Sequence, residues 1–320
     1  MRIGLSHGSG GKEMTELISR FGFFQGDWKN TRNDSATLDL GDKQLIFTTD
    51  SFVVDPIFFP GGDIGHLAFC GTVNDLAVMG ARPLGLSLGL VIEEGFSQNE
   101  LDRIIGSIRK LSDDTGIPVA TGDTKVMENG KIDRIVVNTS GVAVIDKDSL
   151  LTKDVFVGDK VIVSGGIGEH AVAILSKRFD YEAAVVSDSK PLVEEIESVK
   201  PMIKVAKDPT RGGLSAALNE ICGCHKVGML LDEGSIPAKP EVRKVAEMLG
   251  ISLYELACEG RFVCIVSPGN AKRAVEGLQR FNPDARVIGE VTDDDKVVMQ
   301  TIIGKRILPC PSGRIVPRIC

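Results

Sequence analysis

A charged stretch without hydrophobic periodicity divides the sequence into two halves of similar length. Residues 146–159 show neither helical nor strand periodicity, whereas apolar segments of both kinds run through the chain on either side. Because a chain of 320 residues is too long for one ordinary core, two domains of about 150 residues each are expected. We place them at residues 1–153 and 154–307, followed by a C-terminal tail at 308–320.

Strand and helix patterns alternate in both halves, but without a regular repeat of parallel strands joined by helices. Ser97, with Glu100 three residues later, has the pattern of a capping box at a helix start. Helical patterns cover 14–21, 61–80, 98–111, 169–178, 191–205, 213–223, 239–249 and 270–280. Strand patterns cover 44–49, 84–92, 117–120, 134–145, 160–164, 227–231, 261–266, 285–291 and 296–303. This mixture favours an α+β fold.

Composition and charge exclude several classes of protein. The net charge of −7 argues against nonspecific nucleic-acid binding, which needs a basic surface. No apolar run reaches the roughly 18 residues of a membrane span, and residues 1–7 lack the apolar core of a signal peptide. The seven cysteines are odd in number and scattered, which does not indicate a disulfide framework. We therefore expect a cytoplasmic enzyme with no membrane partner.

Three aspartates of the first half follow or interrupt apolar segments. Asp50 closes the strand at 44–49, Asp75 lies in an otherwise apolar helix, and Asp123 follows the strand at 117–120. A buried carboxylate is unfavourable unless cations or hydrogen-bond donors compensate it. Each aspartate alone is more often a turn or cap residue, but the three together indicate a divalent cation of the kind that accompanies nucleotide phosphates.

Two glycine-containing segments lead into helices and have the composition of anion sites. They are HGSGGK at 7–12, whose spacing is not that of a P-loop, and DPTRGG at 208–213. Backbone N–H groups at such helix starts bind phosphate, and a guanidinium adds a planar fork of donors. The alternative for both is a plain turn before a helix. The candidate residues are Gly10, Gly11, Lys12, Asp208, Arg211, Gly212 and Gly213.

Two further patterns each allow two interpretations. Glu259 precedes a strongly apolar strand, so it is a general base if buried, although a surface carboxylate at a strand start is the more common case. Cys222, Cys224 and His225 offer zinc-ligand types, but no second ligand pair stands at a suitable spacing. Cysteines at the end of an apolar helix are more often small core residues.

The last residue of the sequence is Cys320. Three prolines within 308–320 oppose both helix and central strand, so we expect an extended, mobile tail. About a dozen extended residues reach roughly 40 Å, which is enough to enter a cleft or meet a partner. A thiol on such a tail suits a carrier of acyl groups, and Arg318 would favour its thiolate form. The alternative is an incidental terminal cysteine.

Taken together, these segments resemble the HypE family of hydrogenase maturation factors, in the superfamily of aminoimidazole ribonucleotide synthetase and selenophosphate synthetase. The matching stretches are HGSGGK at 7–12, TTDSFVVDPIFFPGGDIG at 48–65, GTVNDLAVMGA at 71–81, TGDTKV at 121–126, DPTRGG at 208–213 and PRIC at 317–320. They span the whole chain. One departure is Cys258, because the family usually has Asn before the glutamate to which Glu259 corresponds.

The resemblance implies a two-domain α+β ATP-binding fold of the aminoimidazole ribonucleotide synthetase type, with a flexible C-terminal tail. It implies a homodimer in which the N-terminal domains pair strands into a shared barrel. ATP would lie in a cleft of the N-terminal domain near that interface. By resemblance, Mg²⁺ would be held by Asp50, Asp75 and Asp123, with Asp208 a weaker candidate, and the phosphates would be covered by Gly10, Gly11 and Lys12.

The resemblance also implies a reaction on Cys320. The carbamoyltransferase HypF would load a carbamoyl group onto the sulfur, and ATP-dependent dehydration would turn it into a thiocyanate. The cyanide would then pass to iron on the scaffold proteins HypC and HypD, for a [NiFe]-hydrogenase. Lys125 would neutralise developing charge, and Glu259, or alternatively Lys125, would remove the nitrogen protons. Two other functions stay open: an ATP-dependent small-molecule ligase or kinase such as selenophosphate synthetase, and a non-catalytic thiol carrier or scaffold.

Overall fold

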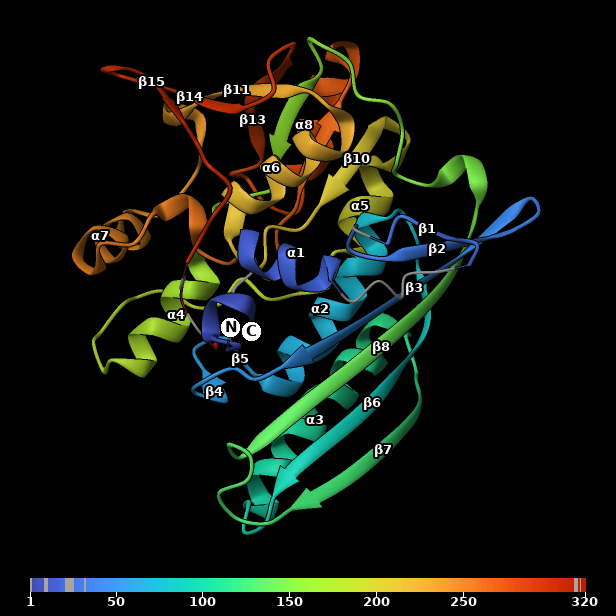
Figure 1. The fold of residues 1–320 in the computed structure, drawn as a ribbon, viewed down its shortest axis with the longest axis vertical. Coiled ribbons are helices and arrows are strands. Elements are labelled where there is room, and N and C mark those ends of the chain that lie inside the picture. Colours follow the sequence, from blue (N-terminus) through green and yellow to red (C-terminus); the bar gives the residue numbers. More distant parts are fainter. Residues whose placement is uncertain (1, 9–10, 21–25, 32, 314–315, 317) are drawn as a thin grey trace.

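The computed structural model describes residues 2–8, 11–20, 26–31, 33–313, 316 and 318–320. It contains two large sheets, one formed by each half of the chain, with helices packed between and around them (Figure 1). A small hairpin of β4 (Phe58–Phe59) and β5 (Gly62–Asp63) precedes the first long helix. Short 3-10 helices lie at Leu5–Gly8, Lys147–Ser149, Lys200–Met202, Glu233–Ser235, Leu253–Glu255 and Pro268–Asn270.

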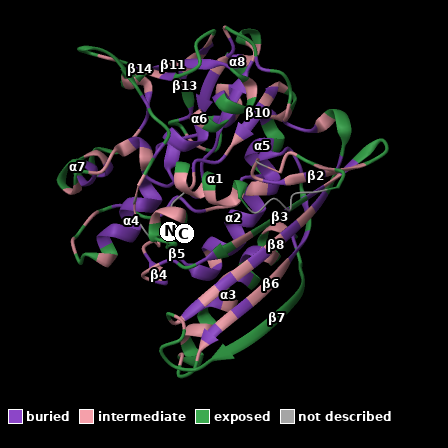
Figure 2. Cartoon of the chain, viewed as in Figure 1, coloured by how far each residue is buried: buried purple, intermediate pink, exposed green. Residues whose placement is uncertain are grey.

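The first sheet has six strands in the order β1-β2-β3-β8-β6-β7. The strands are β1 (Trp28–Lys29), β2 (Ala36–Leu40), β3 (Lys43–Phe52), β8 (Ile135–Asp146), β6 (Pro83–Glu93) and β7 (Val119–Met127). All neighbours are antiparallel except β6 and β7, which are parallel. The edge strand β7 is exposed along its whole length (Figure 2).

Helices α2 (Ile64–Val78) and α3 (Gln98–Thr115) cover one face of this sheet. The Asp63 side chain caps α2 by accepting hydrogen bonds from the N–H groups of Gly65 and His66. Nearly every residue of α2 is buried, because the helix lies between the first sheet and the second half of the chain (Figure 2). An apolar character all around the helix is what such a position requires.

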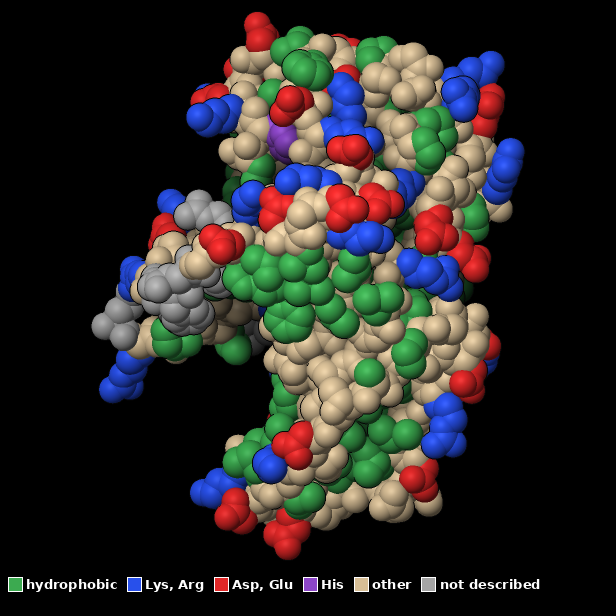
Figure 3. All heavy atoms as spheres, turned by 90° about the vertical axis from the view of Figure 1, so that its right-hand side faces the viewer, with side chains coloured by type: hydrophobic (Ala, Val, Ile, Leu, Met, Phe, Trp, Pro, Cys, Tyr) green, Lys and Arg blue, Asp and Glu red, His purple; other side chains and the backbone are tan. Residues whose placement is uncertain are grey.

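The other face of the first sheet has no helix against it in the part of the chain that the structure describes. Alternating side chains of β3 and β8 therefore differ in burial: Ile46 is fully buried, whereas Phe47 and Val144 are exposed. On the side of the molecule where β2, β3, β8 and β7 lie, hydrophobic side chains form a broad surface group (Figure 3). An uncovered sheet face is ordinarily polar, so this one is unusual.

The second sheet has seven strands in the order β10-β12-β9-β13-β11-β14-β15, and only β11 and β14 are parallel. The strands are β10 (Ile203–Lys207), β12 (Val263–Val266), β9 (Lys160–Val163), β13 (Arg286–Thr292), β11 (Gly228–Asp232), β14 (Val297–Thr301) and β15 (Gly304–Ile307). The remaining helices are α1 (Lys12–Ser19), α4 (Glu169–Arg178), α5 (Val193–Val199), α6 (Gly213–His225), α7 (Pro240–Leu249) and α8 (Ala271–Leu278).

One hydrophobic core joins the two halves. Phe69 and Ile104 of the first half belong to the same buried cluster as Leu192 and Phe262 of the second. No helix within the described ranges combines the length and apolar character that crossing a bilayer would take. The domain limits expected from the sequence stay predictions.

Several local predictions were wrong. The helix expected at 191–205 ends at Val199, because Pro201 lacks the N–H that a continuing helix needs, and β10 begins at Ile203. The strand expected at 296–303 is present as β14 but ends earlier, at Thr301, where the turn to β15 begins. The capping box is absent: the Ser97 side chain makes no cap bond, and Glu100 accepts a hydrogen bond from Arg134 at 2.7 Å.

Candidate functional site

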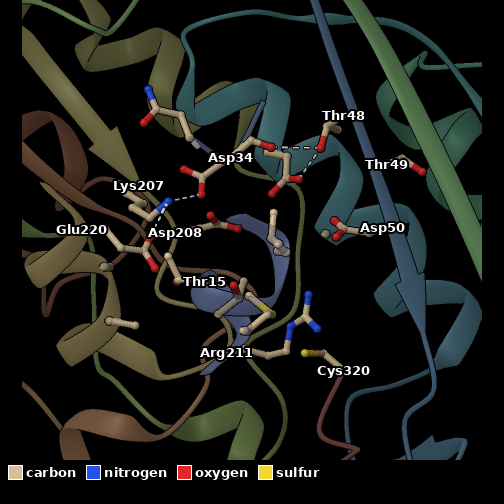
Figure 4. A pocket seen from close by; sticks show the side chains of 18 of the residues that line it. Thr15, Asp34, Thr48, Thr49, Asp50, Lys207, Asp208, Arg211, Glu220 and Cys320 are labelled. Carbon is tan, nitrogen blue, oxygen red and sulfur yellow. Dashed lines mark hydrogen bonds and ion pairs between the residues drawn. The ribbon is translucent and has the colours of Figure 1, made fainter. Parts of the chain in front are cut away.

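A cavity of about 960 Å³ lies between the two halves. One wall is formed by α1, β3 and α2, and the other by the loop from β10 to α6 and by the segment around Glu259. The described end of the tail, Cys320, also lines it. The side chains that converge there are acidic, basic and hydroxyl-bearing (Figure 4).

Three aspartates from distant parts of the sequence meet at this cavity. Ligand oxygens of Asp34, Asp75 and Asp208 all lie within 4.8 Å of one another. Thr48 joins two of them, because its hydroxyl oxygen lies 2.7 Å from Asp75 Oδ2 and 2.9 Å from the carbonyl oxygen of Asp34. We call Asp34, Asp75 and Asp208 the acidic cluster.

The acidic cluster is poorly compensated by the protein itself. Burial raises the pKa of Asp75 and of Asp208 well above the usual carboxyl range, and the charges of neighbouring aspartates raise both further. Asp208 Oδ2 is buried and has no hydrogen-bond partner among the described residues. Asp50, on β3, faces the same cavity, and burial raises its pKa although Arg211 opposes the shift. Such an oxygen-rich, electron-rich site is suited to a hard divalent cation.

Lys207 compensates only one edge of the acidic cluster. Its ammonium group donates to Asp34 Oδ1 and, at 2.9 Å, pairs with Glu220 Oε2. Burial alone would lower the pKa of Lys207, but the charges of Asp34 and Glu220 outweigh it and raise that pKa above its usual range. Lys207 is therefore a permanent cation held beside Asp34, while Asp75 and Asp208 are left without a bonded cation in the described residues.

Glu259 lies deeper in the cavity and is only 2% exposed. Asn74 Nδ2 donates to the Glu259 carbonyl oxygen at 3.1 Å, and the Glu259 N–H donates to Asp188 Oδ1 at 3.3 Å. Burial raises the pKa of the Glu259 carboxyl well above its usual range, and the negative charges of Asp208 and Asp188 add to the shift. A buried carboxyl group of raised pKa is what a general base near neutral pH requires. The sequence had favoured a surface position, which is wrong.

The Cys320 sulfur points into the cavity near the Arg211 guanidinium (Figure 4). Burial raises the pKa of the Cys320 thiol well above its usual range, and Glu259 raises it further, whereas Arg211 opposes the shift. The expectation that Arg318 favours the thiolate is wrong, because that guanidinium pairs instead with Asp55 and Asp133. A neutral thiol is a poor nucleophile.

The structure does not bring Asp123 and Lys125 to this cavity within one chain. Both lie on the edge strand β7, with side chains 72% and 70% exposed, and they pair with each other at 3.2 Å. The pairing lowers the pKa of Asp123. Asp123 thus lies within a strand rather than after one, and Asp50 lies within β3 rather than at its end.

The two glycine segments differ in what they contribute. Gly212 and Gly213 have positive φ values of 82° and 59° at the start of α6, and they direct Arg211 into the cavity. Gly11 begins α1, and a β-carbon there would lie 2.5 Å from the Pro311 carbonyl oxygen. Lys12 is on the surface beside Glu16, and Gly10 lies outside the described residues.

Sequence reasoning missed Asp34 and Lys207. Asp34 stands in a run of polar residues before β2, which has the composition of any loop. Lys207 is the last residue of β10, a strand whose first three residues were read as the end of the helix at 191–205. The cysteine cluster joins no metal site among the described residues: Cys222 is buried, and Cys224 is exposed 3.9 Å from Asn33 Oδ1.

Comparisons with known proteins match this geometry to a family. Residues 32–145 match the N-terminal domain model of AIR synthase related proteins, and residues 157–302 match the C-terminal domain model. A carbamoyl dehydratase HypE from Rhizobium leguminosarum bv. viciae is 40% identical over 100% of this chain and 95% of its own length. The chain belongs to the HypE family. The resemblance read from the sequence motifs and the two-domain α+β fold are thereby confirmed.

Solved structures of the HypE family superpose on the whole fold. HypE in a HypE–HypF complex is 38% identical, with a TM-score of 0.86, and the match covers 94% of this chain and 100% of that chain. HypE in complex with ATP is also 38% identical, with a TM-score of 0.83 and complete coverage of both chains.

Proposed function

We propose that the protein is an ATP-dependent carbamoyl dehydratase that converts an S-carbamoyl group on its own Cys320 into a thiocyanate, as a source of cyanide ligands for the iron of a [NiFe]-hydrogenase. The observation that carries the proposal is the Cys320 sulfur in a cavity shared with Arg211, Glu259 and an acidic cluster. Membership of the HypE family and the likeness to an ATP-bound relative support it.

The acidic cluster fits the magnesium ion of a nucleotide. Asp34, Asp75 and Asp208 supply hard oxygen ligands, and the partnerless Asp208 Oδ2 is what a cation would satisfy. Asp50 stands close enough for its charge to raise the pKa of Asp75. When bound, Mg²⁺ would offset the negative charge of the ATP phosphates. The cavity of about 960 Å³ has room for a nucleotide together with the end of the tail.

The chemistry begins with a poor leaving group. An amide oxygen does not leave readily, so the γ-phosphoryl group of ATP is transferred to the carbonyl oxygen of S–C(=O)–NH₂. The C–O bond then breaks, inorganic phosphate leaves with that oxygen, and two protons leave the nitrogen to give S–C≡N. ADP and phosphate are the other products, and one proton is released overall.

Three side chains of this chain have roles in that sequence. Arg211, whose guanidinium lies near the sulfur, stabilises charge that develops on the carbonyl oxygen. Glu259, buried and of raised pKa, accepts a nitrogen proton. Because the Cys320 thiol has a raised pKa inside the cavity, loading by HypF must occur with the tail outside.

We also infer a homodimer that brings Lys125 and Asp123 to a neighbouring cavity. Support comes from the exposed edge strand β7, the uncovered sheet face with Phe47 and Val144, and the lack of any role for Lys125 within one chain. Edge strands with exposed apolar residues tend to pair with another chain. A charge at Val126, which is 68% exposed on β7, should then shift the protein to monomers in light scattering and slow dehydration. An unchanged mass would contradict the dimer.

The partners follow from the reaction. HypF is proposed as the donor of the carbamoyl group, in keeping with the relative seen in a HypE–HypF complex. HypC and HypD are proposed as the acceptors of cyanide. Because the reaction consumes ATP, we expect it in the cytoplasm. The glycines Gly10 and Gly11 with Lys12, and Gly212 with Gly213, are proposed to contact the nucleotide phosphates.

Intact-mass measurement tests the function. The protein is incubated with HypF, carbamoyl phosphate and ATP, and the terminal peptide is weighed with and without ATP. We expect a carbamoyl adduct that loses the mass of one water only when ATP is present. Cys320→Ser should form no adduct while it retains nucleotide binding. An adduct that ATP does not change would favour a non-catalytic carrier.

A further inference from the structure

The tail is held in the cavity by contacts that do not involve its reactive sulfur. Ile319 is 4% exposed and belongs to the core that joins the two halves of the chain. Around it, two residues of α4, His170 and Arg178, and two residues after β3, Val53 and Asp55, bind the backbone or side chain of the last three residues. We call His170, Arg178, Val53 and Asp55 the tail slot.

His170 grips the last peptide group. Its imidazole is fully buried, with Nε2 2.8 Å from the Ile319 carbonyl oxygen and Nδ1 2.8 Å from Ser187 Oγ. Because a carbonyl oxygen only accepts, Nε2 carries the proton and the Ser187 hydroxyl donates to Nδ1. Ser187 Oγ in turn accepts from the Ser189 N–H at 3.1 Å, and the Phe59 ring meets the imidazole edge-on. Contacts with Ser187 and Phe59, which do not involve the tail, therefore hold the His170 Nε2–H donor in position.

Arg178 grips the preceding peptide group. Its Nη2 donates to the Arg318 carbonyl oxygen at 2.6 Å, and its Nε donates to the Asp55 carbonyl oxygen at 2.8 Å. The Asp55 N–H donates to the same Arg318 oxygen at 3.1 Å. The Arg318 side chain then reaches back, with Nε donating to the Val53 carbonyl oxygen at 3.1 Å. Two successive carbonyl groups of the tail are therefore both satisfied by the slot.

Different residues contact the backbone and the sulfur at the end of the chain. The slot binds the backbone of residues 318–319 and the apolar Ile319 side chain, whereas Arg211 and Glu259 face the sulfur. The grip is therefore the same for a free, a carbamoylated or a cyanated sulfur. The slot therefore contributes equally to docking of all three forms, and any difference between them comes from Arg211 and Glu259, which face the sulfur.

We propose that the tail slot is a docking site for the end of this chain, in which His170 and Arg178 are positioning residues that set how long the tail stays in the cavity. The proposal rests on the proposed function for its meaning, but the docking contacts themselves are all made by residues of this chain. A weaker slot must favour the released tail. It must therefore speed the step that needs Cys320 outside, which is loading by HypF, and slow the step that needs it inside, which is dehydration.

The test measures how fast Cys320 reacts with N-ethylmaleimide in the full-length protein, read by peptide mass. Cys224 is exposed, and its side chain contacts Asn33 rather than the tail slot, so its labelling is an internal reference. His170→Leu removes the donor to Ile319, and His170→Gln keeps an N–H donor in its place. We expect about tenfold faster labelling of Cys320 in His170→Leu, from the loss of one buried hydrogen bond, and partial return toward the wild-type rate in His170→Gln.

A second variant keeps the proposal testable if His170→Leu does not fold. Ile319→Ala removes buried apolar contact from the tail alone, and it should also speed labelling of Cys320 while labelling of Cys224 stays unchanged. Labelling of Cys320 at the wild-type rate in Ile319→Ala and in folded His170→Leu would overturn the proposal. An equal rise at Cys224 would overturn it too, because general loosening would then be the cause.

The two reaction steps add a readout that a purely structural role would not move. In His170→Leu we expect faster carbamoyl loading by HypF and slower ATP-dependent loss of water from the loaded protein. If both steps slow together while the labelling rate stays at the wild-type value, the slot has no part in tail exchange. If labelling rises as expected but no variant or wild-type sample ever loses water, the slot stands and the proposed dehydratase function fails.

Discussion

Removing one charge from the acidic cluster should stabilise the protein while it abolishes cation binding. Asp208→Asn keeps the shape of the side chain but removes a buried charge whose oxygen lies within 4.8 Å of ligand oxygens of both Asp34 and Asp75. Two unit charges 4.8 Å apart repel by about 3.5 kcal/mol at an effective dielectric constant of about 20. Because the oxygens lie within that distance, fully ionised pairs that are closer repel more strongly at the same dielectric constant.

The realised gain is smaller for two reasons. Lys207 already neutralises part of the charge on Asp34, and the raised pKa values of Asp75 and Asp208 mean that protons relieve some of the repulsion near neutral pH. We therefore expect Asp208→Asn to raise the free energy of unfolding by about 1–3 kcal/mol at pH 8, where ionisation is more complete. At about 2–4 °C for each kcal/mol, Tm should rise by about 2–12 °C.

Calorimetry after dialysis against EDTA measures the rise in stability of Asp208→Asn over wild type. A repeat with Mg²⁺ and ATP measures how much ligand stabilisation the variant loses. Ligand at a hundred times its Kd adds about 2.7 kcal/mol to the wild type, and the variant should lose most of that increment. Asp113→Asn is the matched control, because it removes the same charge from an exposed site on α3. The reasoning is refuted if EDTA-treated Asp208→Asn is no more stable than wild type, or if Mg²⁺ and ATP stabilise both equally.

Three further changes have expected outcomes. The folded-state pKa of Glu259 is raised, so the free energy of unfolding of the ligand-free wild type should fall as pH rises from the ordinary carboxyl pKa through the raised one. Glu259→Gln should lack this fall. Urea unfolding from pH 5 to 9 should therefore show a difference in stability between the two proteins that grows as pH rises. Gly213→Ala should cost about 2 kcal/mol or more in thermal unfolding, because φ is 59° and the new β-carbon would lie 2.6 Å from the Leu256 carbonyl oxygen. Gly71→Ala should slow dehydration in the mass assay, because its β-carbon would push the Phe52 ring, 2.8 Å away, at the cavity wall, and an unchanged rate would contradict this packing.

Local chemistry in the sequence singled out three of the residues that line the cavity: Arg211, Asp75 and Cys320. Arg211 between a turn and two glycines needs only its own helix start to face the cavity, and Asp75 in an apolar helix is conspicuous because the helix is buried on all sides. Cys320 was conspicuous by its place in the sequence. In each case the signal is carried by residues within one turn of the functional side chain.

Features made by long-range packing could not be predicted. Asp34 matters because the end of β10 places Lys207 against it, 173 residues away in the sequence. Asp123 and Lys125 show the opposite case, since a suggestive motif falls on an exposed edge strand away from the cavity of its own chain. Three prolines favour a tail without regular structure, and the described residues of 308–320 form no helix or strand. The docking of the tail depends on His170, which is 149 residues from Ile319.

The acidic cluster draws its members from both sides of the fold: Asp34 and Asp75 belong to the part of the chain that forms the first sheet, and Asp208 to the part that forms the second. A cation bound there would therefore bridge the two parts of the molecule as well as neutralise charge. If magnesium nucleotide binds there as proposed, its binding should make the junction between the sheets more rigid, and product release should make it more mobile. The rate of amide hydrogen exchange at this junction should then report whether nucleotide is bound or released.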